Sequence, residues 1–412
     1  MVIMVKILLL GKGVANNGCK RLLEDSSIDF DYFDKNEITE GEYDYIVKAP
    51  GIPLYDSCFK NIHGKVISDI ELAYVLRRVY MIGVTGSNGK TTVCTMLYQI
   101  LKHKYRVVLC GNIGYSICDA VVDNKDAEIF IVEMSSFQLE AINALDCNIS
   151  VLLNIDMCHL DHHLNMRNYV DAKLKIALKQ SFNRYTIYNT DNVYLSGLHK
   201  MILSTPIGFS YNSTINRIYV LNDYIYFKNK RIFKLKKEDL KCRHKVENYL
   251  AVLSVISIMN FSIKKACKIL KDFKDVEYRL NKIDKYVYND AKSTNCASTN
   301  AAISSLDKIH LICGGYDRFM DIKIDDDNLK KLICVYAYGQ TKDKIKNYFQ
   351  NKNIRCLVFN TLEDALRSAY IKRIDNEIIL YSPMFASYDQ YHSYNERGKE
   401  FNELYFQLKN RL

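Results

Sequence analysis

The chain has few of the residues that build flexible linkers, and it has no apolar run long enough to span a membrane. Among its 412 residues are no tryptophan, four prolines and seventeen glycines, which leaves no room for long low-complexity linkers. No apolar run approaches the roughly 20 residues that a membrane-spanning helix needs, so we expect no membrane partner. The apolar N-terminus is interrupted by Lys6 and has no small-residue cleavage site before Gly11, so we expect a buried first strand instead of a signal peptide.

The cysteines give no sign of a disulfide framework or of a zinc site. Their number is thirteen, which is odd, and they are scattered with no C-x-x-C pair. Both features argue against a disulfide-stapled secreted domain and against a zinc ribbon. We therefore expect the protein to reside in the reducing cytoplasm.

The chain carries a formal net charge of +10 but no nucleic-acid-binding motif. Its densest basic stretch spans residues 228–245 and follows the alternating Tyr224-Ile-Tyr-Phe227, a pattern that predicts a surface hairpin with a solvated face. No helix-turn-helix, zinc-finger or RNP pattern accompanies this stretch, so we expect no nucleic-acid partner. A positive surface also suits a cleft that binds small polyanionic substrates.

Length and pattern predict three α/β domains. With 412 residues, of which 48% are hydrophobic, the chain is long enough for more than one core. Apolar strands alternate with helical stretches, which is typical of parallel sheets, and we assign residues 1–79, 80–275 and 276–412 to the three domains. Further strands are expected at 106–109, 128–132, 149–155, 285–289, 310–313, 334–338, 355–359 and 377–381, and further helices at 244–259 and 396–408.

The segment from Tyr80 to Thr92 predicts a phosphate-binding loop. It reads as an apolar strand and a glycine loop, after which Lys90 and Thr91 open a helix (Val93 to Leu101). The strict G-x-x-x-x-G-K-[ST] pattern is not met, because Val84 stands where the first glycine belongs, but the shorter G-x-x-G-K-T-T form is present. Backbone N–H groups of such a loop bind phosphate, its lysine reaches the outer phosphates, and its hydroxyl binds Mg²⁺.

Two further strands of the second domain end in polar residues. One delivers Glu133, and the next is followed by His159-Leu-Asp-His-His163. Ligands bind beyond the carboxyl ends of parallel strands, and a carboxylate with an imidazole suits a divalent cation there. A dinuclear metallohydrolase would also cluster histidine and aspartate, but the H-x-H-x-D-H order is absent. A solvated loop is the other alternative for His159, and we expect His162 and His163 to be surface residues.

Short sequence strings occur in one collinear order from the N-terminus to the last helix. They are Val47-Lys-Ala-Pro-Gly51, Gly111-Asn-Ile-Gly114, Glu133-Met-Ser-Ser-Phe-Gln-Leu-Glu140, Asn154-Ile-Asp-Met-Cys-His-Leu-Asp161, Tyr169-Val-Asp-Ala-Lys173, Asn289-Asp-Ala-Lys-Ser-Thr-Asn295, Gly314-Gly-Tyr-Asp-Arg318 and Ser382-Pro-Met-Phe-Ala-Ser-Tyr-Asp-Gln390. With these strings and the phosphate loop, the chain resembles the ATP-dependent Mur ligases. The Ser-Ser-Phe-Gln and Ser-Pro-x-x-x-Ser-x-Asp-Gln strings are similar to those of the D-glutamate-adding branch.

The resemblance implies a fold and a reaction. The implied fold has an N-terminal Rossmann-like domain that binds the UDP substrate, a central phosphate-loop domain that binds ATP, and a C-terminal dinucleotide-fold-like domain that binds the amino acid. The implied reaction is the ATP-dependent addition of D-glutamate to UDP-N-acetylmuramoyl-L-alanine through an acyl phosphate, in peptidoglycan precursor synthesis. The implied cofactors are ATP, a pair of Mg²⁺ ions and a carbamate on Lys173, and we expect a monomer.

The resemblance also implies roles for individual residues of this chain. The residues implied as catalytic are Lys90, His159 and Lys173. Those implied to hold ATP are Gly86, Ser87, Asn88, Gly89, Lys90, Thr91, Thr92, Asn248, Arg279, Asp290 and Lys292. Those implied to hold the metal ions are Thr91, Glu133, His159 and Lys173. Those implied to hold the muramoyl and D-glutamate substrates are Asn112, Thr294, Arg318, Ser387 and Tyr394.

Some positions depart from the family pattern. Lys245 stands where the family often has an asparagine beside adenine, and Ala291 follows Asp290 in place of the usual serine. Residues 34–36 follow the second strand at the place of a uracil pocket, with no motif to fix them.

Other interpretations stay open at this point. A related ligase could add another amino acid, although the D-N-P-R-type string of the diaminopimelate-adding branch is absent. A nucleotide-dependent regulatory protein would lack Lys173, His159 or Glu133, and all three are present. Lys173 alone could be an exposed helix lysine, and Arg318 could pair with Asp317 on the surface.

Overall fold

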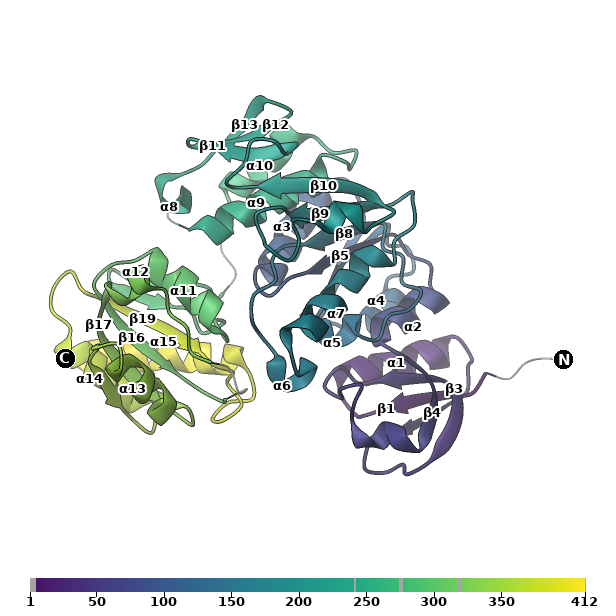
Figure 1. Cartoon of the computed structure of the whole chain (residues 1–412), viewed down its shortest axis with the longest axis horizontal. Helices are drawn as coiled ribbons and strands as arrows, with labels where there is room; N and C mark the ends of the chain where they lie inside the picture. The colour runs from purple at the N-terminus through teal and green to yellow at the C-terminus, as the bar shows by residue number, and fades with distance from the viewer. Residues whose placement is uncertain (1–4, 241, 274–276, 318–320, 412) are drawn as a thin grey trace. The chain divides into compact units, whose positions relative to one another are not determined.

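The computed structural model describes residues 5–240, 242–273, 277–317 and 321–411. Over these residues the chain forms α/β sheets that are rich in parallel strands (Figure 1), which confirms the predicted fold class. The described chain divides into two compact units. The first consists of Met1–Ile155, His162–Leu235 and Lys245–Phe273, and the second of Asp156–Asp161, Lys236–His244 and Lys274–Leu412.

The N-terminal sheet belongs to the first unit and has the strand order β2-β1-β3-β4, with parallel neighbours throughout. Strand β1 lies between β2 and β3 and is buried, which explains its uninterrupted apolar sequence. This confirms the expected buried first strand. The elements are β1 (Ile7–Leu10), α1 (Val14–Asp25), β2 (Phe30–Phe33), β3 (Gly41–Lys48), the 3-10 helix η1 (Ser57–Lys60), β4 (Ile62–Ile67) and α2 (Asp69–Leu76).

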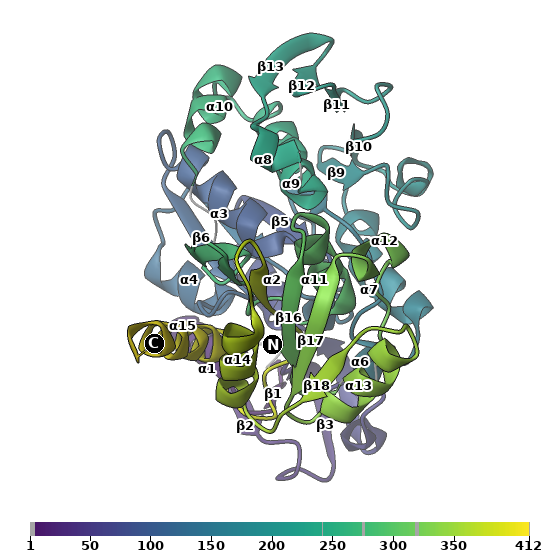
Figure 2. The ribbon, with the colours of Figure 1, turned by 90° about the vertical axis from the view of Figure 1, so that its left-hand side faces the viewer.

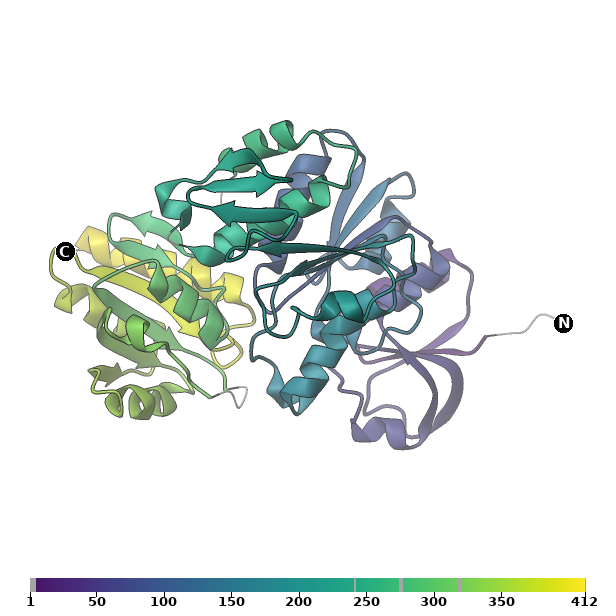
Figure 3. The ribbon, with the colours of Figure 1, turned by 45° about the horizontal axis from the view of Figure 1, so that its top comes forward.

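The central sheet, also in the first unit, has the order β13-β12-β11-β10-β9-β8-β5-β7-β6. Its strands run parallel from β6 to β11, and β12 and β13 complete it as an antiparallel ribbon, which confirms the predicted hairpin. Figure 3 shows its later strands, in teal, lying side by side. The strands are β5 (Met81–Thr85), β6 (Val107–Gly111), β7 (Ile129–Glu133), β8 (Ile149–Leu152), β9 (Tyr185–Asn189), β10 (Thr205–Ser210), β11 (Ile218–Leu221), β12 (Tyr224–Phe227) and β13 (Lys230–Lys234).

The helices that follow these strands bring polar residues to the carboxyl ends of the strands. The expected buried helix at 244–259 is confirmed as α9, whose side chains are buried from Val246 to Ile256. The helices are α3 (Lys90–Leu101), α4 (Ile117–Asp123), α5 (Ser136–Leu139), α6 (Leu160–His163), α7 (Met166–Leu178), η2 (Leu198–Lys200), α8 (Lys237–Leu240), α9 (Arg243–Ile256) and α10 (Ile263–Lys271). No helix in the described ranges is both long and apolar enough to cross a bilayer.

The C-terminal sheet belongs to the second unit and has the order β14-β15-β19-β16-β17-β18. Only the pairing of β14 with β15 is antiparallel in the described sheet. Helices α14 and α15 lie against this sheet (Figure 2). Leu366 and Phe401 of these helices share one buried core cluster with Tyr336 and Tyr381 of the strands. The elements are β14 (Asn281–Asp284), β15 (Val287–Asn289), α11 (Cys296–Ser304), β16 (Ile309–Gly314), α12 (Asp326–Leu329), β17 (Leu332–Tyr338), α13 (Lys342–Gln350), β18 (Cys356–Val358), α14 (Leu362–Lys372), β19 (Ile378–Met384) and α15 (Tyr394–Arg411).

Candidate active site

The phosphate loop connects β5 to α3 as the sequence predicts. Gly89 caps the helix in the left-handed region with φ of 83°, which glycine adopts without a steric penalty. A Cβ atom on Gly89 would lie 2.5 Å from Asn248 Oδ1 and 3.2 Å from Leu153 Cδ1. Both the backbone angle and the close neighbours therefore require glycine here, and Asn248, a predicted ATP-binding residue, lies against the loop.

Lys90 lies across the loop that precedes it. Its Nζ donates hydrogen bonds to the carbonyl oxygens of Gly86 at 2.7 Å and Ser87 at 3.2 Å. The ammonium is therefore held at the start of α3, where helix N–H groups already favour an anion. Thr92, two residues further on, is buried, and its hydroxyl has no hydrogen-bond partner among the described residues.

Thr91, Glu133 and Asn112 meet beside this helix start, although they come from three different elements. Thr91 Oγ1 donates to Glu133 Oε2 at 2.7 Å, and Asn112 Nδ2 donates to Glu133 Oε1 at 3.4 Å. Glu133 ends β7 and is buried. A hydroxyl and a carboxylate side by side are hard oxygen donors of the kind that Mg²⁺ accepts. The structure thus brings three of the predicted site residues together.

Lys173 lies beneath the phosphate loop. Its side chain is buried in α7, and its Nζ donates to the Gly86 carbonyl oxygen at 3.0 Å and to Thr85 Oγ1 at 3.4 Å. The same Nζ lies 4.9 Å from the centroid of the Tyr169 ring, whose hydroxyl is 2.8 Å from Ser87 Oγ. The alternative of an exposed helix lysine is therefore wrong, because Lys173 contacts the loop itself.

Asn154 holds the loop from the other side, and the sequence analysis did not single it out as a site residue. Its Oδ1 accepts from the Asn88 backbone N–H at 2.8 Å, and its own carbonyl oxygen accepts from the Ser87 N–H at 2.9 Å. Its place in the Asn154–Asp161 string was the signal that could have identified it. The loop backbone is therefore fixed by a side chain that follows β8.

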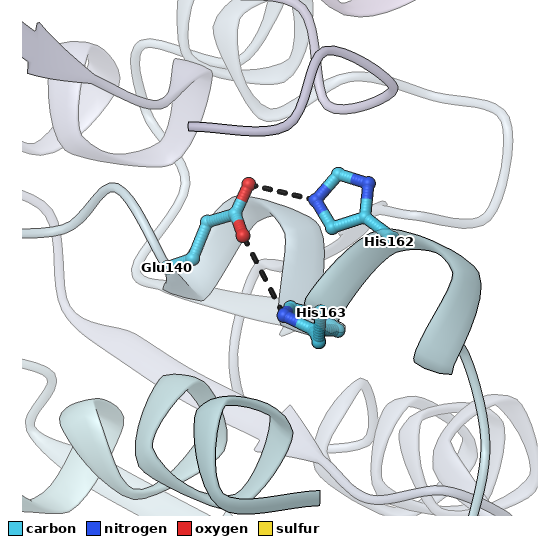
Figure 4. Close-up of side chains that lie close together, drawn as sticks. All are labelled: Glu140, His162 and His163. Carbon is cyan, nitrogen blue, oxygen red and sulfur yellow. Dashed lines mark hydrogen bonds and ion pairs between the residues drawn. The ribbon is translucent and has the colours of Figure 1, made fainter. Parts of the chain in front are cut away.

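His162 and His163 are buried, so the prediction that they are surface residues is wrong. Both face Glu140 (Figure 4): His162 Nε2 is 2.9 Å from Glu140 Oε1, and His163 Nδ1 is 3.6 Å from Glu140 Oε2. Burial lowers the pKa of His163 to about 4, so its imidazole is neutral at neutral pH. Burial also opposes ionisation of Glu140, but His162 and Lys48 outweigh it and hold the pKa of Glu140 below its usual value.

These three side chains have the donor set of a metal site, with ligand atoms within 4.8 Å of one another. The Lys48 ammonium, however, lies 2.7 Å from Glu140 Oε1 and is itself buried. Because a lysine cation already neutralises the carboxylate, we interpret this group as an ion-pair cluster. The predicted metal ligand His159 lies instead in the segment Asp156–Asp161 of the second unit, half-buried and with φ of 57°, and its role as a ligand stays a prediction.

The second unit contains the remaining candidates. Asp290 is buried and accepts hydrogen bonds from the Leu280 backbone N–H and the Ser382 hydroxyl, and burial raises its pKa to about 6. Lys292 Nζ lies 5.1 Å from the Tyr394 ring centroid, so two predicted residues lie together.

Four further candidates come from residues 276–412. Arg279 Nε is buried without a hydrogen-bond partner among the described residues. Ser387 is buried, and Thr294 is partly exposed. Arg318 lies outside the described residues.

Arg397 is a residue of this unit that the sequence analysis missed. Its side chain in α15 is fully buried, and its Nη2 donates to the carbonyl oxygens of Ala291 at 3.0 Å and Phe385 at 2.9 Å. Ala291 stands between Asp290 and Lys292, and Phe385 precedes Ser387 by two positions. One guanidinium therefore ties together two loops that carry predicted site residues.

Known proteins match the chain both in sequence and in fold. The Mur ligase middle domain family matches residues 84–256. A UDP-N-acetylmuramoylalanine–D-glutamate ligase from Shouchella clausii is 34% identical over 86% of this chain and 81% of its own length. One from Caldicellulosiruptor saccharolyticus is 35% identical over 87% of this chain and 83% of its own length.

Among solved structures, the MurF ligase from Thermotoga maritima in complex with ADP has a TM-score of 0.64 at 16% identity and covers 98% of this chain and 95% of its own. The MurC ligase from the same organism, a UDP-N-acetylmuramate–alanine ligase, has a TM-score of 0.61 at 15% identity and covers 98% and 99%. At these identities the structural likeness establishes the fold.

Proposed function

The chain belongs to the family of UDP-N-acetylmuramoylalanine–D-glutamate ligases, and on that premise we propose how its residues divide the reaction. The protein is an ATP-dependent ligase that adds D-glutamate to UDP-N-acetylmuramoyl-L-alanine in peptidoglycan precursor synthesis. We assign the reaction to the phosphate loop because the side chains of Lys90, Thr91, Glu133 and Lys173 lie together around it.

The loop residues Gly86 to Thr92 hold the ATP phosphates in this proposal. Backbone N–H groups at the start of α3 face the phosphates, and the Lys90 ammonium turns from the loop carbonyls to the transferred group. The terminal carboxylate of the UDP substrate takes the γ-phosphoryl group and becomes an acyl phosphate. Such a transfer depends mainly on positioning and on charge neutralisation, and both are tasks of these residues.

Thr91, Glu133, His159 and Lys173 are the proposed metal-binding residues. The Thr91 hydroxyl and the Glu133 carboxylate fit Mg²⁺, because both are hard oxygen donors and lie 2.7 Å apart. Bound Mg²⁺ would neutralise the phosphate oxygens. Lys173 fits only as its carbamate, since an ammonium would repel the ions whereas a carbamate supplies anionic oxygens. We assign the contact with the muramoyl substrate to Asn112, and its hydrogen bond to Glu133 supports this assignment.

The second half of the reaction forms the amide bond. The amine of D-glutamate attacks the acyl carbon, and the tetrahedral intermediate expels phosphate together with the former carboxylate oxygen. We assign D-glutamate to Thr294, Arg318, Ser387 and Tyr394 in residues 276–412, and the UDP moiety to residues 1–79. The residues assigned to the nucleotide outside the loop are Asn248, Arg279, Asp290 and Lys292. We further propose that the protein is a cytoplasmic monomer with no nucleic-acid partner.

Phosphate release tests this function directly. Purified protein with ATP, Mg²⁺ and UDP-N-acetylmuramoyl-L-alanine is expected to release phosphate with D-glutamate and not with alanine, L-glutamate or a diamino acid. Release with another amino acid would contradict the D-glutamate assignment. Lys90→Ala is the control, because it removes a phosphate ligand at a helix start and leaves the core unchanged. Near-normal turnover by this folded variant would refute the nucleotide assignment.

A further inference from the structure

The Lys48–Glu140 cluster, which consists of Lys48, Ser136, Glu140, His162 and His163, links the N-terminal sheet to the central one. Lys48 ends β3, and its Nζ donates to Glu140 Oε1 at 2.7 Å and to the Phe137 carbonyl oxygen at 3.1 Å. Both acceptors belong to α5 or follow it directly, and both charged side chains are buried. Since α5 follows strand β7 of the central sheet, a buried ammonium at the end of β3 that bonds to acceptors in and next to α5 fixes the N-terminal sheet relative to the central one.

The cluster also fixes the orientation of His163. Glu140 Oε2 lies 3.6 Å from His163 Nδ1 (Figure 4). Ser136 Oγ lies 2.9 Å from His163 Nε2. The ring of His162 stacks on Phe137 at a centroid distance of 4.0 Å and closes the other side of the carboxylate. The hydrogen bond with Ser136 and the packing of the His163 ring against the rings of Phe137, His162 and Tyr169 therefore hold this imidazole in one orientation beside the carboxylate.

His163 leads from the cluster to the phosphate loop. Its ring packs against Tyr169 at a centroid distance of 5.4 Å. Tyr169 in turn carries the two contacts described above, its hydroxyl with Ser87 and its ring with the side chain of Lys173. The contacts from Lys48 to Lys173 are therefore continuous, and all of these residues belong to the first compact unit.

We propose that Lys48 and Glu140 are positioning residues for the ligase reaction. Their ion pair holds His163 against Tyr169 and so keeps Tyr169 and Lys173 in place against the phosphate loop, while it fixes the UDP-binding sheet relative to that loop. This inference rests on the proposed function, because it assigns its effect to the acyl-phosphate step. Small displacements of groups that position reactants lower kcat more than they lower binding.

A double-mutant cycle of Lys48→Met, Glu140→Gln and the double variant distinguishes a positioning effect on kcat from the stability cost of leaving a buried charge unpaired. Lys48→Met leaves a buried carboxylate without its cation, which lowers the thermal midpoint strongly, whereas the double variant lacks both charges of the pair and regains stability. We expect kcat to fall about 10-fold to 100-fold in Lys48→Met and to stay low in the double variant, because the link from β3 to α5 is still missing. The KM values for ATP and for the UDP substrate should change less than about 3-fold.

Arg21→Met is the matched control. Arg21 in α1 pairs with Asp119 and Asp123 of α4, so the substitution breaks an ion pair between the same two domains at an exposed place without a contact to Tyr169. Its kcat should equal that of the wild type. Recovery of kcat together with the thermal midpoint in the Lys48→Met/Glu140→Gln variant would overturn the proposal, since the cluster would then be structural only.

Two further measurements keep the proposal testable if the charge variants fold poorly or if the wild type adds a different amino acid. Ser136→Ala removes one partner of His163 and no charge, and it should lower kcat about 3-fold to 10-fold. Hydrogen exchange should show faster exchange in α7 in Lys48→Met and in Ser136→Ala, but not in Arg21→Met. Unchanged exchange of α7 in both variants would refute the proposed link, whatever the substrate.

Discussion

Gly89→Ala tests the phosphate loop more sharply than removal of a charged side chain does. The substitution adds one methyl group, so it changes neither the charge nor the hydrogen-bonding groups of the site. It does act on the two features that define the loop, which are the positive φ of 83° at Gly89 and the closeness of Asn248 and Leu153. We expect Gly89→Ala to stay folded, to lose stability and to bind ATP poorly.

The size of the effect follows from the geometry. An alanine in the left-handed region costs about 1–2 kcal/mol relative to the right-handed one. The new methyl group would lie 2.5 Å from Asn248 Oδ1, so the amide has to move, and overpacking of this kind costs about 1–3 kcal/mol. The sum of about 2–5 kcal/mol is below or near the low end of the stability of an ordinary domain, about 5–15 kcal/mol. If the loop backbone moves to relieve this strain, it loses the geometry that binds phosphate.

Chemical denaturation and calorimetric titration with ATP measure both outcomes. The double variant Gly89→Ala/Asn248→Ala should regain the steric part of the loss, about 1 kcal/mol or more, but not the backbone part. Gly197→Ala is the matched control, because Gly197 has φ of −93° and no atom within 4 Å of an added Cβ. Wild-type stability and wild-type ATP affinity in Gly89→Ala would refute the assigned loop geometry.

Three further predictions concern the other parts of the site. Lys173→Ala should be nearly inactive and should regain part of its turnover with acetate, whose oxygens can replace those of a carbamate; inactivity throughout an acetate titration would count against the carbamate. Arg318→Ala should raise the D-glutamate KM by an amount that corresponds to about 2–5 kcal/mol while the ATP KM changes little, and Arg318→Lys should fall between, since it keeps the charge and loses the bidentate geometry. An unchanged D-glutamate KM in Arg318→Ala would remove Arg318 from the pocket. The third prediction concerns the stability of the protein at acidic pH. Because burial lowers the pKa of His163 from 6.5 to about 4, the unfolded chain binds the proton more readily, so the free energy of unfolding should fall as pH drops from 6.5 toward 4. The loss should reach about 3 kcal/mol at most, and His163→Gln should flatten that part of the pH profile in denaturant titrations.

The sequence predicted the phosphate loop well because its chemistry depends on local backbone shape. A loop that turns its N–H groups toward phosphate needs glycine at defined positions, and an apolar strand must precede it. The helix begins at Lys90, which with Thr91 was expected to open it, although the apolar pattern of the helix starts only at Val93. The pattern of apolar residues reveals only the buried part of a helix, whereas its first turn is polar when it faces a ligand. The strand ends shifted for the same reason, since β7 continues through Glu133.

The burial of His162 and His163 could not be predicted in this way. Their sequence neighbours Asp161 and Leu164 are exposed or polar, so the local pattern is that of a surface loop. The two histidines are buried against Glu140 and its partner Lys48, and both of these residues are distant from them in the sequence. A charged residue that ends a strand directly after the apolar Ile46 and Val47, as Lys48 does, was the available signal. A buried lysine requires an acceptor, but the sequence does not say which of the many carboxylates supplies it.

Arg397 extends this argument to the second unit. In the sequence it resembles any arginine of a polar helix, and the residues predicted around it, Asp290, Lys292 and Ser387, come from two separate strings. The guanidinium is nevertheless fully buried, and it holds the backbone of both strings by their carbonyl oxygens. Residues that meet a ligand are revealed by the chemistry that the ligand needs. Residues that hold those ligand-binding residues in place need only hydrogen-bonding capacity and length, which many arginines share. The positioning residues of a site are therefore identified by burial and by contacts between distant segments, which only the fold supplies.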